Sequence, residues 1–113
     1  MADVQVMYWK EIPVQVKADD GATQISETLD KRFQEGVDAV AMFDGSAGTD
    51  EYLIGWEWEA IGDVPGSAKA AASATVDRIN DRFPSDFVGR IRKLHLSGRR
   101  NPEPGSVDHW MEE

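Results

Sequence analysis

The chain contains no cysteine, only two histidines, and far fewer basic than acidic residues among its 113 positions. Without cysteine it can form neither a disulfide framework nor a thiolate metal site, so its stability must come from packing. No apolar run approaches the roughly 20 residues that span a bilayer, and the first residues lack the basic and apolar regions of a signal peptide. We therefore predict a single-domain cytoplasmic protein that does not enter a membrane.

The shortage of basic residues gives the chain a strong negative charge. It carries 21 acidic against 12 basic side chains, a formal net charge of −9. Such a surface repels nucleic-acid phosphates and anionic lipid headgroups over a distance of about 8 Å at physiological salt. We predict no nucleic-acid partner. The charge itself has two interpretations, solubility or recognition of a basic partner, and the sequence does not choose between them.

Candidate catalytic and metal-binding residues are few. His95 and His109 stand 14 positions apart with no pattern typical of a zinc site. Ser106, Asp108 and His109 supply the residue types of a catalytic triad, but they fall in a segment that we predict to be a tail without a rigid scaffold. We predict no catalytic residue, no metal and no cofactor.

Three segments show the two-residue periodicity of β-strands. Residues 4–9 and 14–18 alternate around a charged turn at Lys10-Glu11, which indicates a hairpin. In the third segment, residues 52–61, we expect Trp56 and Trp58 to face the core while Glu57 and Glu59 face water.

Helical spacing predicts two main helices and one short helix. The first is expected from an apolar stripe at Ile25, Leu29, Phe33, Val37 and Val40, and the second from Ala68 to Phe83. Residues 87–94 are compatible with a short third helix, although Leu94-His95-Leu96 could also be extended. Gly98 onward, with Pro102 and Pro104, is typical of a tail.

These elements predict an α+β fold in the order ββαβα. A three-stranded, largely antiparallel sheet carries the two main helices on one face and leaves the other face wet or open to a partner. A short C-terminal helix and a tail follow. The predicted domain spans residues 1–98, and the predicted tail spans residues 99–113.

Several segments resemble a known family. Tyr8-Trp9-Lys10-Glu11-Ile12-Pro13-Val14-Gln15-Val16 is similar to the opening Tyr-Trp-Arg-Asp-Ile-Pro-Ala-Gln-Val of the small bacterial "virulence factor" domain family. The helix sequence from Arg32 to Met42 and the segment from Thr49 to Leu53 are also similar to it. The resemblance covers roughly residues 4–95. It implies an effect on bacterial behaviour rather than a particular reaction, and it carries over no catalytic residues.

One basic cluster interrupts the acidic chain, formed by Arg90, Arg92, Lys93, Arg99 and Arg100 with His95 nearby. These cations either complement the dipole of a helix C-terminus or bind an anion or an acidic partner. The cluster has no interleaved aromatic residues, which argues against a platform for single-stranded nucleic acid.

Two tryptophans have open roles. Trp9 either packs under the first helix or is an exposed anchor at an interface. Trp110 either folds back onto the domain or inserts into another subunit of a homo-oligomer.

Two functional hypotheses follow. The first is a non-catalytic interaction module or accessory subunit that binds a protein through a face or edge of the sheet together with Trp9 and the basic cluster. The second is a small enzyme or anionic-ligand binder that uses the basic cluster alone. Alanine substitution at Arg90, Arg92 and Lys93 would affect protein capture under the first hypothesis and small-anion binding under the second.

Overall fold

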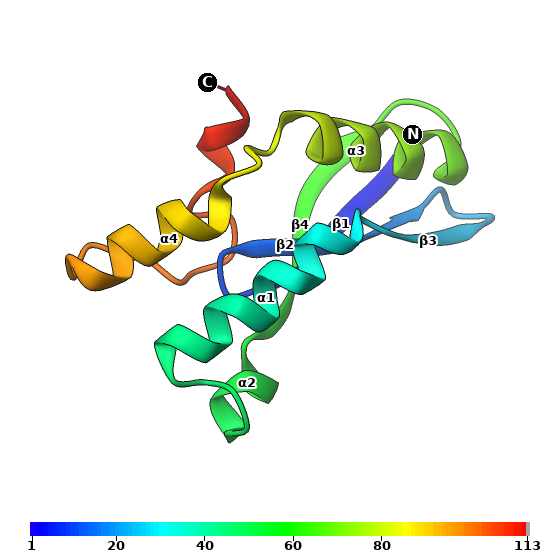
Figure 1. Cartoon of the computed structure of the whole chain (residues 1–113). Helices are drawn as coiled ribbons and strands as arrows, with labels where there is room; N and C mark the ends of the chain where they lie inside the picture. The colour runs from blue at the N-terminus through cyan, green and yellow to red at the C-terminus, as the bar shows by residue number, and fades with distance from the viewer. Residues whose placement is uncertain (113) are drawn as a thin grey trace.

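The structure is a computed structural model and describes residues 1–112; Glu113, the last residue of the predicted tail, lies outside the described residues. Its elements follow one another as shown in Figure 1: β1 (Ala2–Trp9), β2 (Ile12–Asp19), β3 (Gln24–Thr28), α1 (Lys31–Asp44), α2 (Asp50–Ile54), β4 (Trp56–Val64), α3 (Ala68–Arg82), α4 (Phe87–Leu96) and the 3-10 helix η1 (Asp108–Glu112). The predicted α+β class is confirmed. None of the helices in residues 1–112 is long and apolar enough to cross a membrane.

The sheet has four antiparallel strands in the order β3-β2-β1-β4, so the prediction of three strands was wrong. The additional strand is β3, which we had assigned to the start of the first helix. Ile25 pairs with Ala18 and alternates with exposed neighbours, so it continues the sheet instead of the helical stripe. The helix itself begins only at Lys31.

The predicted hairpin is confirmed. β1 and β2 pair antiparallel around Lys10 and Glu11, and Lys10 has a positive φ of 52°. The alternation of β1 and β2 directs one set of side chains into the core, where they are buried: Val4, Val6, Tyr8, Val14, Val16 and Ala18. α1 and α3 both pack on β2 and cover this face of the sheet.

The third predicted strand differs most from the structure. Asp50–Ile54 forms the short helix α2, and the strand starts only at Trp56. Register places Glu57 opposite Tyr8 and Trp58 opposite Met7, so Trp58 lies on the open face, where it is 36% exposed. The prediction that Trp56 and Trp58 anchor the core was therefore wrong for Trp58, and Trp56 is only partly buried. β4 is an edge strand, and its middle residues are exposed.

An aromatic cluster joins the helices instead. The ring of Phe33 on α1 lies 5.4 Å from the rings of both Phe83 and Phe87. Gly36 permits the close approach of α4, because a Cβ atom at this position would lie 2.4 Å from the Phe87 ring. Residues 87–96 are thus a helix packed beside α1, which decides between the two alternatives for this segment (Figure 1).

Residues 99–112 are not a free tail. The chain returns along the body, and η1 contacts α3 (Figure 1). Val107, Trp110 and Met111 are buried, and the Trp110 ring lies 6.4 Å from that of Phe83. The prediction of a tail was wrong for these residues, because their apolar side chains complete the core. Of the two roles considered for Trp110, it folds back onto the domain.

Candidate functional site

The fold distributes the predicted basic cluster over three environments. Arg90, Lys93 and Arg99 line one cleft. Arg92 is exposed on α4 and does not contribute to that cleft. Arg100 is buried in a separate ion-pair network. Residues that are adjacent in the sequence therefore have different physical roles.

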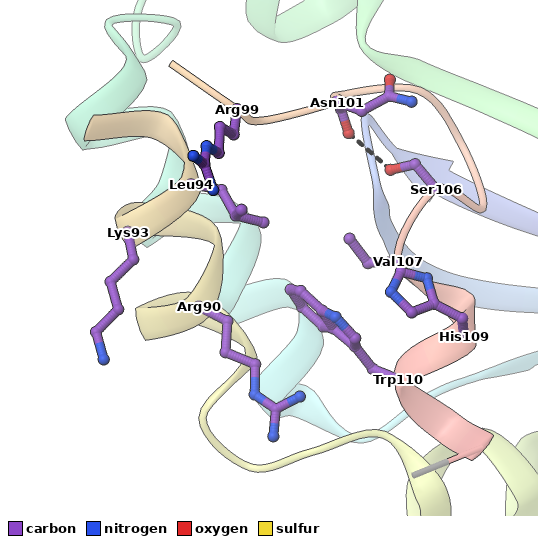
Figure 2. A pocket seen from close by; sticks show the side chains of 9 residues that line it. All are labelled: Arg90, Lys93, Leu94, Arg99, Asn101, Ser106, Val107, His109 and Trp110. Carbon is purple, nitrogen blue, oxygen red and sulfur yellow. Dashed lines mark hydrogen bonds between the residues drawn. The ribbon is translucent and has the colours of Figure 1, made fainter. Parts of the chain in front are cut away.

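The cleft lies between α4 and residues 99–112, which we call the returning segment, and has a volume of about 480 Å³. Figure 2 shows its lining, with Leu94 and Trp110 close to one another and Arg99 above them. Val107 adds to the apolar part and His109 adds a polar group at one side, while Lys93 lies at the outer edge with its amino group directed away from Trp110. Most of the exposed lining is apolar, so the cleft offers an apolar floor with cations around it.

The cations of the cleft are not equally available. Arg90 pairs with Asp86 at 3.0 Å and stacks over the Trp110 ring at 5.3 Å. Lys93 and Arg99 are exposed, and neither forms an ion pair with a carboxylate of residues 1–112. A local excess of unpaired positive charge thus remains on a protein that is acidic overall.

Arg100 belongs instead to a buried network at the hairpin tip. Its guanidinium donates two hydrogen bonds to the Glu11 carboxylate, both of 2.7 Å, and a third of 2.9 Å to Asp44. Lys10 Nζ also donates to Asp44, at 2.8 Å. The side chains of Glu11, Asp44 and Arg100 are 1%, 2% and 7% exposed, so these charges are paired away from water.

The pKa of Asp44 reports how well this network is satisfied. Burial alone would raise the pKa of this carboxyl, yet donors from Lys10, Ser46 and Arg100 outweigh burial and lower it. The Lys10-Glu11 pair of the resemblance motif thus holds the hairpin to α1 and to the returning segment. Its role in this chain is structural.

Trp9 also has an internal role. Its side chain is fully buried, and its Nε1 donates to the Tyr52 carbonyl at 2.9 Å. Gly55 allows the indole to approach, since a Cβ there would lie 2.8 Å from Nε1. Of the two roles considered for Trp9, packing in the interior is the one that the structure shows, and Trp9 does not belong to an exposed surface.

A second polar cavity was missed at the level of sequence. The Tyr8 hydroxyl donates to Asp108 Oδ2 at 2.6 Å, and both residues line a cavity of about 350 Å³ with His109. The sequence predicts no role for Asp108 and His109, because they fall in the predicted tail. The apolar residues around them, Val107, Trp110 and Met111, were the available signal that this segment is anchored.

The triad considered from the sequence does not form. The Ser106 hydroxyl donates to the Asn101 carbonyl at 2.6 Å and not to His109 (Figure 2). Within residues 1–112, no three His, Asp or Glu side chains converge as metal ligands.

Comparison with known proteins identifies a family. No curated protein and no solved structure matches the chain. A family model described as "Virulence factor" matches residues 7–91, which run from the end of β1 to the middle of α4. The match ends at Ile91, so of the residues that line the cleft only Arg90 lies within it, and the others, from Lys93 to Trp110, lie beyond it. Since the match covers most of the chain, this protein belongs to the virulence factor family.

Proposed function

We propose that the domain binds an anionic ligand in the cleft between α4 and residues 99–110, without performing a reaction on it. The observation that carries this proposal is the pairing of two cations, Lys93 and Arg99, with an apolar floor. Neither cation has a carboxylate partner among residues 1–112, and both line the same 480 Å³ cleft. This is the anion-binding form of the second sequence hypothesis.

The lining defines the class of ligand. Leu94, Val107 and Trp110 can contact an apolar or aromatic group of the ligand. Lys93 and Arg99 can donate hydrogen bonds to its phosphate or carboxylate. The cleft volume lies within the range of roughly 300–1,000 Å³ that is usual for small-molecule sites. The ligand that fits best is an organic phosphate, sulfonate or carboxylate that carries a ring or a short hydrocarbon chain.

Calorimetry with phenyl phosphate tests the proposal, with inorganic phosphate as the comparison. Lys93→Ala with Arg99→Ala should weaken phenyl phosphate binding by about a hundredfold or more, since two charge-assisted hydrogen bonds of roughly 1.5–3 kcal/mol each are lost. Arg92→Ala is the matched control, because it removes an exposed cation of the same helix outside the cleft. Equal loss in the control would mean that only net charge matters, which would contradict a defined site.

Inorganic phosphate separates the two parts of the ligand. It should bind more weakly than phenyl phosphate, because it leaves Leu94 and Trp110 uncovered. Replacing Leu94 by Ala should reduce the difference between the two ligands. If both ligands bind equally, the apolar floor plays no part, and the assigned ligand class is wrong.

One observation favours the first hypothesis, a protein-interaction module of the cytoplasm, as a second candidate. β4 is a nine-residue edge strand whose residues 57–63 are all exposed. Glu57, Glu59 and Asp63 lie along it, and no Lys or Arg occurs from residue 45 to residue 68. This edge would repel a second copy of itself and would suit an extended basic segment of another protein, added as a fifth strand.

A pair of synthetic peptides tests this second candidate. A peptide of alternating Lys and Val should shift the amide resonances of β4, while the same peptide with two central prolines should not, because proline cannot complete the ladder. Glu57→Lys with Glu59→Lys should abolish the effect. Equal shifts from both peptides would indicate unspecific attraction between opposite charges.

A further inference from the structure

The cavity beside Tyr8 contains polar groups that the anion cleft does not use. It has a volume of about 350 Å³ and is bounded by β1, β4, α3 and η1. Val6, Ile61, Ile79 and Met111 form its apolar walls. Its polar lining differs in chemistry from that of the basic cleft, so the two cavities call for different ligands.

Asp108 is the central group of this cavity. Its Oδ2 accepts a hydrogen bond of 2.6 Å from the Tyr8 hydroxyl. Its Oδ1 is buried and has no hydrogen-bond partner among residues 1–112. Because buried carboxylate oxygens are almost always hydrogen-bonded, this atom calls for a donor from outside residues 1–112, such as a water molecule or a ligand.

The hydroxyl oxygens of Tyr8 and Thr75 at this cavity can also accept hydrogen bonds. Thr75 uses its proton in a bond of 2.8 Å to the Ala71 carbonyl, and Tyr8 uses its proton on Asp108. Each oxygen keeps lone pairs and has no further proton to give. Three oxygens of residues that line the cavity can therefore each accept a hydrogen bond, namely Asp108 Oδ1, Tyr8 Oη and Thr75 Oγ1, and of these Asp108 Oδ1 is the one without any partner among residues 1–112.

The charges around the cavity favour a positive ligand. Two carboxylates line it, those of Asp108 and Glu112, and the one guanidinium, that of Arg78, pairs with Glu112 at 2.6 Å. Burial raises the pKa of Asp108 even though Tyr8, Arg78 and His109 act in the opposite direction. Burial also raises the pKa of the Tyr8 hydroxyl, and the carboxylates of Asp108 and Glu59 add to that effect. Among residues 1–112, the carboxylates that line the cavity therefore outnumber its guanidinium groups.

We propose that this cavity binds a small primary ammonium ion with an aliphatic group. The ammonium group donates to Asp108 Oδ1, and the aliphatic part covers Val6, Ile61 and Met111. An ammonium group has three N–H donors and no acceptor, which matches a cavity whose hydroxyl and carboxylate oxygens all accept. The site uses side chains other than Lys93 and Arg99, so it does not depend on the proposed anion cleft.

An NMR titration of the full chain with n-butylammonium chloride tests this proposal. Amide resonances of Tyr8, Ile61 and Asp108 should shift and saturate, and sodium chloride at the same ionic strength should not reproduce the shifts. n-Butanol has the same aliphatic group without the charge, and it should bind at least about tenfold more weakly, because a charge-assisted hydrogen bond is lost. Equal binding of the alcohol would overturn the ammonium assignment and leave an apolar cavity only.

Asp108→Asn gives the decisive variant. Its amide can still accept from Tyr8, so the fold should persist, and a thermal melt checks that it does. Butylammonium binding should weaken by about tenfold or more, since the carboxylate charge is gone. Glu103→Gln is the matched control, because it removes one exposed carboxylate of the same returning segment outside the cavity. Unchanged binding in Asp108→Asn would overturn the proposal.

A second measurement uses the unmodified chain. The Asp108 carboxyl ¹³C resonance reports the protonation of this group directly. Bound butylammonium should lower its pKa, because a nearby positive charge favours the carboxylate. No change in the titration of Asp108 under saturating ligand would contradict contact between the ammonium group and this carboxylate, whatever shifts occur elsewhere.

Discussion

The hairpin-tip network and the Tyr8–Asp108 pair both join a residue of the segment 99–112 to β1 or the hairpin turn through a carboxylate. They differ in how many of the carboxylate oxygens have a hydrogen-bond donor. At the hairpin tip, Arg100 donates to both oxygens of Glu11, and both oxygens of Asp44 also receive donors. At the Tyr8 cavity, one oxygen of Asp108 has a donor and the other has none among residues 1–112.

This difference separates a structural role from a binding role. In a buried ion-pair network each carboxylate oxygen has a donor from the chain, so the network fixes the fold without a ligand. An incompletely satisfied carboxylate beside a cavity can still accept a hydrogen bond from a ligand. The pKa values show the same difference. Hydrogen-bond donors lower the pKa of Asp44 in spite of its burial, whereas burial raises the pKa of Asp108.

The largest loss of stability is expected for Arg100→Met. This change leaves the Glu11 carboxylate buried without its partner, which should reduce the free energy of unfolding by about 3–5 kcal/mol. Urea denaturation measures the effect. Glu11→Met combined with Arg100→Met should cost less than Arg100→Met alone, because no unpaired charge then remains. A loss below about 1 kcal/mol for the single variant would contradict a structural role of this pair.

A smaller loss is expected for Tyr8→Phe. It removes the one side-chain donor to the Asp108 carboxylate among residues 1–112, and a hydrogen bond to a charged group contributes about 1.5–3 kcal/mol. In an Asp108→Asn background the same change should cost less, about 0.5–1.5 kcal/mol, because the acceptor is neutral. Equal losses in both backgrounds, measured by urea denaturation, would show that the charge of Asp108 does not matter to Tyr8.

The two carboxylates should also give stability profiles of opposite sign. Asp44 has a lowered pKa when folded, so its contribution is present above the unfolded value of about 3.9 and is lost as the pH falls below it. Asp108 has a raised pKa when folded, so its contribution decreases as the pH rises from about 4 through the folded value.

Unfolding at a series of pH values measures these opposite contributions in two variants. Asp44→Asn should flatten the acid limb of the profile, and Asp108→Asn should remove the decrease at higher pH. The same slope change in both variants would contradict the assigned directions.

The smallest stability effects belong to the basic cleft. Lys93→Ala and Arg99→Ala should each change the free energy of unfolding by no more than about 0.5 kcal/mol, because both side chains are exposed and lack a carboxylate partner among residues 1–112. Thermal melts measure this. Since Arg99 and Arg100 are sequence neighbours, a loss for Arg99→Ala as large as that for Arg100→Met would contradict the division of the cluster.

Local patterns predicted the elements that depend on neighbouring residues. The hairpin followed from alternation around Lys10-Glu11, and the helix α3 followed from its alanine-rich stripe. β3 was missed because Ile25 continues the spacing of Leu29 and Phe33, so a short strand before a helix looks like the helix itself. α2 was missed because Tyr52 continues the alternation of Trp56 and Trp58.

The candidate sites could be predicted only in part. The sequence indicated the basic cluster, because five cations in an acidic chain form a visible contrast. It could not separate Lys93 and Arg99 from Arg100, since that separation depends on which carboxylates lie nearby. It missed the Tyr8–Asp108 pair, whose members are 100 residues apart.

The sequence by itself determined the fold class, the hairpin, the main helices and the family, because periodicity and short motifs are local properties. The tertiary structure alone decided that Trp9 is internal, that the C-terminal segment completes the core, and which charges remain unpaired. The reason is physical: whether a buried charge is satisfied depends on partners that folding brings together, such as Glu11 and Arg100 across 89 residues.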